Sequence, residues 1–349
     1  MSAFYPLKVD KIQQLTANSV AITFAIGEEY KEAFQFKAGQ YITIKKEISG
    51  EELRRAYSIS SSPDLGEITI GVKRVDHGGF SNFANTKLKE GDVLDLSAPE
   101  GRFVFDSEDK KDIIAFAAGS GITPIMSIAK TVLDSNPESR FVLVYGNQNQ
   151  ADTMFYEELR ALEQEYADRF ILQMIYSRAR EEDALFGRID KSVVNFVLKN
   201  KFKEYDFDNY YLCGPEPMIV LVRELLNKKG VPSDKVYFEL FTSSEGEQKQ
   251  KTMAEECKTQ LTVILDEEEQ QLVMDRKETV LDALLKADID APYSCQGGIC
   301  STCIARVSEG AVIMDKNQIL TDGEIADGFV LTCQAHPTTP NLTIDYDDV

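Results

Sequence analysis

Short apolar runs that alternate with polar residues dominate the first hundred residues. Examples are Ser19–Ile26, Gly39–Lys45 and Glu67–Arg74. Such alternation is typical of strands that bury one face, and turn residues separate these runs. The pattern predicts an antiparallel barrel or sandwich over residues 1–107.

A different pattern begins near Lys111. Short apolar runs are now separated by segments of helical periodicity, such as Thr153–Tyr166 and Pro217–Lys229. Strands that alternate with helices indicate a parallel sheet covered on both faces. Five strands are expected, which suits a doubly wound nucleotide-binding domain over residues 108–241. The expected strands are Asp112–Ala118, Arg140–Tyr145, Arg169–Tyr176, Asn209–Cys213 and Lys235–Leu240.

A linker and a third domain complete the chain. Residues 242–258 are rich in Ser, Glu, Gln and Lys and contain no segment that could build a core, so they are expected to be a linker. The third domain covers residues 259–349. Its expected elements are the strand Leu261–Leu265, its hairpin partner Gln271–Met274, the helix Val280–Leu285 and a last strand at Leu342–Tyr346.

The totals bound the class of protein. The chain has 349 residues and a formal net charge of −20, which argues against nucleic acid as a partner. Its amino end lacks the pattern of a signal peptide. The longest weakly charged stretch, Ile113–Leu133, is interrupted by two glycines and a proline, so no membrane span is expected. These features predict a soluble, cytoplasmic protein.

Acidic residues concentrate in the last quarter of the chain. Residues 259–349 contain 17 Asp and Glu against 5 Lys and Arg, a balance of −12. This excess can serve solubility, or it can form a docking face for a basic partner. The charge pattern alone leaves both interpretations open.

Four cysteines in that segment carry the most specific chemistry. Cys295, Cys300 and Cys303 form a C-x4-C-x2-C run, and Cys333 follows downstream. This is the plant-type spacing for a [2Fe–2S] cluster, in which each iron takes two thiolates. Zinc is the alternative, but zinc sites usually present two C-x2-C pairs, and only one is present here. With two further cysteines in the chain, no disulfide framework is expected, which suits a reducing compartment.

A candidate flavin site lies in the first domain. Arg55, Tyr57 and Ser58 are expected at the start of a strand, where alternation puts Arg55 and Tyr57 on one side. A flavin needs an aromatic face for its ring, a small donor near N5 and a cation for its phosphates. These three residue types supply those groups.

A glycine turn at Gly78 strengthens the flavin hypothesis. Ser81 is the candidate cap of a helix that starts at Asn82. Helix N-termini bind phosphate through free N–H groups. A plain serine-capped helix fits the same residues.

Two glycine turns follow strands of the expected parallel sheet. Gly119–Pro124 follows the first strand, and Gly214–Pro215 ends the fourth. Because the carboxyl ends of parallel strands meet at one edge, the two turns are expected to face each other across a nucleotide-binding crevice. The first turn is not the G-x-G-x-x-G fingerprint, since Pro124 occupies the place of the third glycine.

The end of the third strand bears on the choice of nucleotide. An arginine in this region accommodates the 2′-phosphate of NADP, whereas an acidic residue accepts the 2′-hydroxyl of NAD. Ser177 and Arg178 favour NADPH. The acidic run Glu181–Asp183 lies close by, so NADH stays open as the alternative.

Taken together, these motifs resemble a known family. The chain resembles ferredoxin–NADP reductase-type flavoproteins fused to a C-terminal plant-type ferredoxin, which are reductase components of multicomponent oxygenases. The likeness spans essentially the whole chain, and the domain order is most similar to that of phenylacetyl-CoA epoxidase reductases. It implies a β-barrel FAD domain, a parallel-sheet NAD(P) domain, a β-grasp ferredoxin domain and a terminal oxygenase as partner.

The resemblance also implies roles for individual residues, with FAD rather than FMN as the flavin. The implied flavin ligands are Arg55, Tyr57, Ser58, Gly78, Ser81 and Asn82. The residues expected at the pyridine nucleotide are Gly121, Thr123, Ser177, Arg178, Cys213, Gly214 and Pro215. Ile59, Val72, Lys73 and Pro124 complete the expected cofactor-binding set.

The hydride site of this family implies three catalytic residues, Ser58, Cys213 and Glu239. Cys213 can equally be a small buried residue that closes a strand. Phe241 corresponds to an aromatic that covers the flavin ring. In stand-alone reductases that residue is usually a terminal tyrosine, whereas here the chain continues beyond it.

The expected mechanism converts a two-electron donor into one-electron steps. Electrons pass from NAD(P)H to FAD, then to the [2Fe–2S] cluster and then to a partner protein. His77 and His336 are the only histidines, so a Rieske centre or a bis-His haem is not expected. Two other functions stay open, a reductase for a non-oxygenase acceptor and a redox-sensing iron–sulfur flavoprotein.

Overall fold

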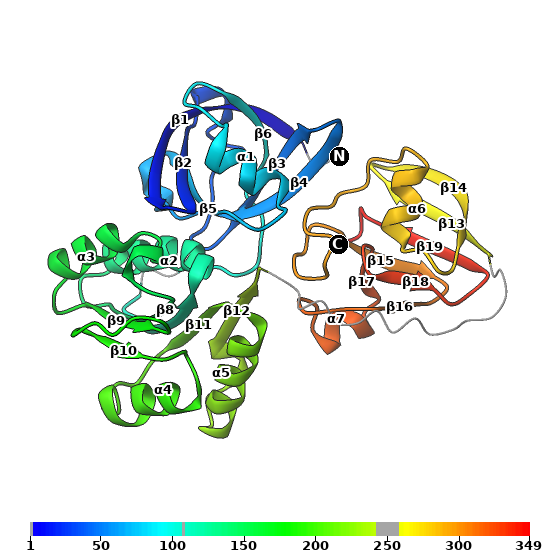
Figure 1. The fold of residues 1–349 in the computed structure, drawn as a ribbon. Helices are drawn as coiled ribbons and strands as arrows, with labels where there is room; N and C mark the ends of the chain where they lie inside the picture. Colours follow the sequence, from blue (N-terminus) through cyan, green and yellow to red (C-terminus); the bar gives the residue numbers. More distant parts are fainter. Residues whose placement is uncertain (1–2, 107–108, 242–257) are drawn as a thin grey trace. The chain divides into compact units, whose positions relative to one another are not determined.

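The computed structural model describes residues 3–106, 109–241 and 258–349. These residues belong to two compact units, Phe4–Phe241 and a second unit that contains residues 258–349 (Figure 1). The predicted boundary between residues 107 and 108 lies outside the described residues, as does the predicted linker except for Lys258, which opens a strand. The predicted domain limits therefore stay predictions.

The first sheet of the larger unit is antiparallel. Its six strands lie in the order β4-β3-β6-β1-β2-β5. They are β1 (Phe4–Thr16), β2 (Ser19–Ala25), β3 (Tyr41–Ile48), β4 (Glu51–Ser58), β5 (Glu67–Lys73) and β6 (Val93–Ser97). Just after β4, Ile59 pairs with Ile70 of β5, so the two edge strands meet and the sheet closes. The predicted antiparallel barrel is confirmed.

Alternation along the strands fills the barrel. Ile42 and Ile44 of β3 face Ile68, Ile70 and Val72 of β5 in one buried cluster. The helix α1 (Gly79–Thr86) covers this cluster with Phe80 and Ala84, which lie one turn apart on one helix face. The β-branched side chains suit the pleated surface of the strands.

The second sheet of the larger unit is parallel and has the order β10-β9-β8-β7-β11-β12. Its strands are β7 (Asp112–Ala118), β8 (Arg140–Asn147), β9 (Phe170–Tyr176), β10 (Ala184–Phe186), β11 (Asn209–Gly214) and β12 (Val236–Leu240). The sequence predicted five strands and missed β10. That strand pairs with β9 through three residues only, too few to show a periodic pattern.

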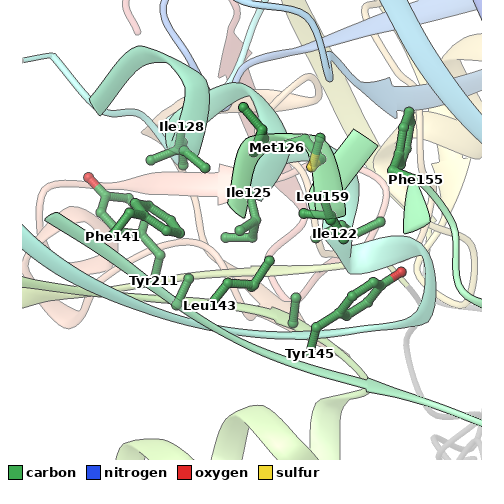
Figure 2. Close-up of a cluster of buried hydrophobic side chains, with 14 of the residues drawn as sticks. Ile122, Ile125, Met126, Ile128, Phe141, Leu143, Tyr145, Phe155, Leu159 and Tyr211 are labelled. Carbon is green, nitrogen blue, oxygen red and sulfur yellow. The ribbon is translucent and has the colours of Figure 1, made fainter. Parts of the chain in front are cut away.

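Helices cover both faces of the parallel sheet, as predicted. Figure 1 shows α2 (Ile122–Ser135) and α3 (Tyr156–Glu165) on one face, with α4 (Lys191–Phe196) and α5 (Glu216–Lys228) on the other. In Figure 2, Ile122, Ile125, Met126 and Ile128 of α2 lie over Phe141, Leu143 and Tyr145 of β8. The residues of α2 are spaced so that they lie on one helix face, and alternate residues of β8 lie on one face of the sheet. The two apolar faces can therefore pack against each other.

The barrel and the parallel sheet share buried contacts. Phe103 and Phe105 after the barrel belong to the same apolar cluster as α2 and β7. The hydroxyl of Ser127 in α2 donates to the backbone oxygen of Ser61 at 2.7 Å, and Tyr211 donates to that of Val104 at 3.0 Å. A Cβ on Gly71 of β5 would lie 2.7 Å from Thr123, so only glycine permits this approach.

The second unit combines a mixed sheet with a short helix. Its main sheet has the order β14-β13-β19-β15-β17, with β13 and β19 parallel. The strands are β13 (Lys258–Leu265), β14 (Glu268–Asp275), β15 (Ile304–Glu309), β16 (Val312–Met314), β17 (Phe329–Leu331), β18 (Ala335–Pro337) and β19 (Asn341–Asp345). The helices are α6 (Val280–Lys286) and α7 (Asp322–Ala326). A β-hairpin followed by a helix packed on the sheet core is the predicted β-grasp arrangement.

None of the described helices is long and apolar enough to cross a membrane.

The close packing at Gly71 leads to a test. Gly71→Ala should lower the free energy of unfolding of the larger unit by roughly 1–3 kcal/mol, because the added methyl group meets Thr123, Met154 and Phe155. Denaturant titration measures the change. Gly323→Ala in α7 is the control, since its Cβ would meet nothing closer than 3.9 Å. Equal stability of the Gly71 variant and the wild type would contradict the packing argument.

Candidate active site and iron–sulfur centre

Three residues from three strands meet where the barrel touches the parallel sheet. Ser58 ends β4, and its hydroxyl donates a hydrogen bond to the Glu239 carboxylate at 3.0 Å. Glu239 on β12 pairs directly with Cys213 on β11. The three residues that the family resemblance implies as catalytic, Ser58, Cys213 and Glu239, are therefore neighbours. In the sequence, 181 positions separate Ser58 from Glu239.

Burial sets the protonation of this group. Desolvation raises the pKa of Glu239 to about 8, and the hydrogen bond from Ser58 opposes that rise. Burial, with the nearby Glu239 charge, also raises the pKa of the Cys213 thiol well above its usual value. At neutral pH the pair is thus a protonated carboxyl group and a neutral thiol. The Glu239 carboxyl group can therefore hold a proton at neutral pH.

Arg55 and Tyr57 lie at the end of β4, not at the start of a strand as predicted, because β4 already begins at Glu51. They pair with Ile44 and Ile42 of β3. Tyr57 is partly buried beside Phe80, with ring centroids 5.4 Å apart. Arg55 is exposed and forms no ion pair within the described chain, so its charge is available to a phosphate.

The helix after the glycine turn begins earlier than predicted. Its N-cap is Gly78, and Ser81 is the third helical residue instead of the cap. The Ser81 hydroxyl accepts the N–H of Val75 at 3.2 Å, which closes the turn. Since no side chain caps α1, its first N–H groups remain available to an anion.

A polar cavity of about 470 Å³ borders this helix. It is lined by Arg74, Asp76, His77, Asn82 and Thr86. The Arg74 guanidinium donates to the Asn82 side-chain oxygen at 2.8 Å, which orients its charge. Sequence reasoning missed Arg74, Asp76 and His77. The available signal was their position in the sequence, because all three lie between Lys73 and Gly78, which were both predicted to bind a cofactor.

The two glycine turns of the parallel sheet lie against each other. A Cβ on Gly121 would collide with the Cys213 carbonyl group, and one on Gly214 would lie 2.8 Å from Met218. Thr123 caps the first turn by donating to the Ser120 oxygen at 3.0 Å. Pro124 follows within the first turn of α2, where its missing N–H breaks no helical bond. Pro215 is the N-cap residue of α5.

Two of the expected cofactor residues are fully buried in the barrel. The side chains of Ile59 and Val72 are 0% exposed, so only their backbone groups could reach a cofactor. Lys73 differs, because its ammonium group lies 3.7 Å from the position of a Cβ on Gly119. Phe241 ends the described part of this unit and packs against its apolar core.

The segment after β9 carries unequal charges. Ser177 and Arg178 bond through their backbone N–H groups to the carbonyls of Asn147 and Gln148. Arg178 is exposed and has no ion pair within the described residues. The acid Asp183 is paired with Arg160 at 3.3 Å. Among the described residues, an unpaired cation therefore stands at the sheet edge where a nucleotide ribose binds in such folds.

The four cysteines of the second unit form two pairs. The neighbouring Cys300 thiol lowers the pKa of Cys295 to about 6, and the Cys295 thiol together with burial raises the pKa of Cys300. Cys303 and Cys333 influence each other in the same way, so that the pKa of Cys303 is raised and that of Cys333 is lowered. Two thiols for each of two irons is the ligand arrangement of a [2Fe–2S] cluster.

The loop around the first pair also fits a negatively charged cluster. The N–H of Gly297 points at the Cys295 sulfur at 3.4 Å. Gly298 has φ +69°, and a Cβ there would lie 2.8 Å from the Lys316 carbonyl oxygen. Within the described residues, no group of three or more His, Cys, Asp or Glu side chains is placed so that it could hold a metal ion.

Three domain-family models match the chain in order. They are the oxidoreductase FAD-binding domain over residues 6–105, the oxidoreductase NAD-binding domain over residues 116–224 and the 2Fe-2S iron-sulfur cluster binding domain over residues 263–338. The chain is 36% identical to a component of the 1,2-phenylacetyl-CoA epoxidase of Escherichia coli (strain K12), over 99% of each protein. This chain belongs to the family of flavin-dependent, iron–sulfur oxygenase reductases.

Other relatives and solved structures are consistent with this family assignment. The reductase is 32% identical to the ferredoxin reductase component of 3-ketosteroid-9-alpha-monooxygenase from Rhodococcus rhodochrous, over 97% of this chain and 96% of that protein. Among solved structures, phthalate dioxygenase reductase matches with a TM-score of 0.63 and 22% identity, over 98% of both chains. An intact type IV self-sufficient cytochrome P450 monooxygenase matches with a TM-score of 0.72 and 22% identity, over 98% of this chain and 41% of that one.

The domain matches and the relatives confirm the predicted cofactors and the predicted electron-transfer chemistry. The reductase is an NAD(P)H-dependent oxidoreductase that moves electrons from NAD(P)H through FAD to a [2Fe–2S] cluster. The assignments of individual residues to these groups stay predictions.

The raised pKa of Glu239 predicts a pH effect on stability. A carboxyl group whose folded pKa is about 8 binds a proton that the unfolded chain has lost above 4.5. The contribution of Glu239 to the free energy of unfolding is therefore complete below pH 4.5. It is lost as the pH rises through 8. Relative to Glu239→Gln, the unfolding free energy of the wild type should fall between pH 5 and about 9.

Parallel denaturant titrations of the protein without cofactors measure this difference. Glu224→Gln is the control, since the Glu224 side chain is exposed on α5, where it pairs with Lys228. A constant difference between wild type and Glu239→Gln across the range would show that Glu239 titrates normally.

Proposed function

We propose that this reductase supplies electrons to a terminal oxygenase of the phenylacetyl-CoA epoxidase type. The observation that carries the proposal is the likeness to the Escherichia coli epoxidase component along the whole chain, through all three domains. The match of residues 263–338 to the 2Fe-2S iron-sulfur cluster binding domain supports a site that handles single electrons.

The residues at the barrel end suit a flavin. FAD, when bound, accepts a hydride and releases electrons one at a time. Tyr57 offers an aromatic face, Arg55 a cation for the phosphates, and the uncapped end of α1 free N–H groups. Lys73 adds a second cation beside the first glycine turn.

The cavity beside α1 supports FAD over FMN. Its volume of about 470 Å³ and its lining by Arg74, His77 and Asn82 suit the adenosine monophosphate half, which FMN lacks. Arg74 supplies a cation, and Asn82 is already one of the expected flavin ligands.

Ser58, Cys213 and Glu239 suit the hydride site. The protonated Glu239 keeps the Ser58 hydroxyl in a fixed direction and adds no negative charge where the nicotinamide and the flavin meet. The neutral Cys213 thiol and the bare backbone of Gly121 and Gly214 leave room for a flat ring. Phe241, which packs against the apolar core of this unit, would cover the flavin ring when no nicotinamide is bound.

Arg178 supports a preference for NADPH. Its exposed guanidinium is unpaired within the described residues, and one acid of the following run, Asp183, is paired with Arg160. A guanidinium forms charge-assisted bonds with a phosphate that a 2′-hydroxyl cannot replace.

Loss of one cluster ligand tests the electron path. Cys333→Ser should lose the cluster and keep FAD, because the cysteines lie in a separate compact unit. NADPH should still reduce the flavin and ferricyanide at wild-type rates, whereas turnover of a purified epoxidase oxygenase component should fall at least about 100-fold. Iron content, flavin absorbance and product formation are measured together.

The control for this test is Cys257→Ser, which changes a cysteine outside the motif. Full oxygenase turnover by Cys333→Ser without iron would refute the proposed electron order. A wild-type protein that reduces its cluster and supports no oxygenase would favour a redox sensor or another acceptor.

Replacement of Arg178 tests the nucleotide preference. Arg178→Ala should lower kcat/KM for NADPH by roughly 10-fold or more and leave NADH nearly unchanged, because only NADPH carries the 2′-phosphate. Arg180→Ala is a matched control two residues away, where the guanidinium stacks on Phe186 at 4.3 Å. An equal loss for both nucleotides in Arg178→Ala would overturn the NADPH assignment.

A further inference from the structure

Thr332, the residue before Cys333, is the centre of a buried hydrogen-bond network. Both its N–H and its hydroxyl group donate to the backbone oxygen of Cys303, at 3.1 and 3.0 Å. Its own carbonyl accepts the N–H of Leu281 at the start of α6, at 3.0 Å. Thr332 is 0% exposed, so no water can take over these bonds. The two cysteines of the second pair are thus linked through one threonine.

Tyr346 extends the network to the end of the chain. Its phenol group donates to the Thr332 hydroxyl oxygen at 2.8 Å. The tyrosine follows β19. Its backbone N–H donates to the carbonyl oxygen of Ile264 on β13 at 3.0 Å, which fixes the backbone that carries the ring. Because Asp345 of β19 pairs with Arg306 of β15, Tyr346 lies at the sheet end where β15 emerges from Cys303.

Packing alone does not require these two hydroxyl groups. Tyr346 and Thr332 are buried beside the apolar cluster of this unit, where Phe and Val of the same shape would fill the space. Replacement of both partners of a buried hydrogen bond by apolar groups of the same shape is often nearly neutral for stability. The hydroxyl groups instead form a directed chain of hydrogen bonds. Tyr346 donates to Thr332, and Thr332 donates to the Cys303 carbonyl oxygen.

We propose that Tyr346, acting through Thr332, is a positioning residue for the Cys303–Cys333 half of the cluster site and raises the reduction potential of the cluster. This inference rests on the proposed ligand set. The two O–H dipoles point their positive ends toward the Cys303 backbone, and positive potential near a cluster favours its reduced, more negative form. The network also restrains the backbone at Cys303, which slows the departure of that ligand.

Two single variants and their combination test the proposal in the full-length holoprotein. Tyr346→Phe, Thr332→Val and the double variant should each shift the midpoint potential to more negative values, as measured by redox titration followed by electron paramagnetic resonance. A chelator should remove the cluster faster from each, by roughly 10-fold for Thr332→Val, the usual scale for outer ligands of a metal site. Thr332→Ser keeps the hydroxyl group and should stay close to the wild type.

Thr259→Val separates this role from a general loss of structure. Thr259 is also fully buried and donates to a backbone carbonyl, that of Thr339 at 2.6 Å, but it lies at the opposite end of the same sheet. Its variant should lower thermal stability and leave the potential unchanged. The same potential shift in Thr259→Val, or unchanged potential and chelation rate in both Tyr346→Phe and Thr332→Val, would overturn the proposal alone. A wild-type protein that binds no cluster would overturn the ligand assignment and this inference together.

Discussion

The hydrogen bond between Ser58 and Glu239 joins the two sheets of the larger unit at the candidate active site. It requires the last residue of a barrel strand to meet an edge strand of the parallel sheet. That meeting depends in turn on close packing elsewhere, at Gly71 against Thr123 and at Ser127 against Ser61. Without those contacts, the hydroxyl and the carboxyl group would be solvated separately, and the desolvation that raises the Glu239 pKa would be absent.

Glycine has a distinct physical role in this arrangement. At Gly121 and Gly214 two backbone turns touch, and any side chain would force them apart. The same requirement for space recurs in the second unit at Gly298, whose positive φ lets the cysteine loop pass close to the Lys316 carbonyl group. In both units close backbone contacts therefore shape the candidate site, where side chains would supply protons, charges and thiolates.

The two units divide the chemistry in a way that follows from their cores. The larger unit buries Cys213 and half-buries Glu239, which favours the neutral form of both groups. The smaller unit points the Gly297 N–H at the Cys295 sulfur, which favours negative charge on that thiol. Separate cores allow each environment to form without compromising the other.

Local patterns in the sequence determined most of the elements. The strand predicted at Asp112–Ala118 matches β7 residue for residue, because a fully buried strand is a continuous apolar run between polar ends. The cysteine spacing identified the cluster for a similar reason, since a compact loop must place three ligands within a few residues of one another.

What only the tertiary structure decided are contacts between residues far apart in the chain. The start of α1 at Gly79 depends on the turn that Ser81 closes with Val75, and β10 exists only because three residues find the edge of β9. The links from Ser58 to Glu239 and from Tyr346 to Thr332 carry no local signal. Each depends on the register and packing of strands that meet only after the chain has folded, and periodicity within a single segment does not contain that information.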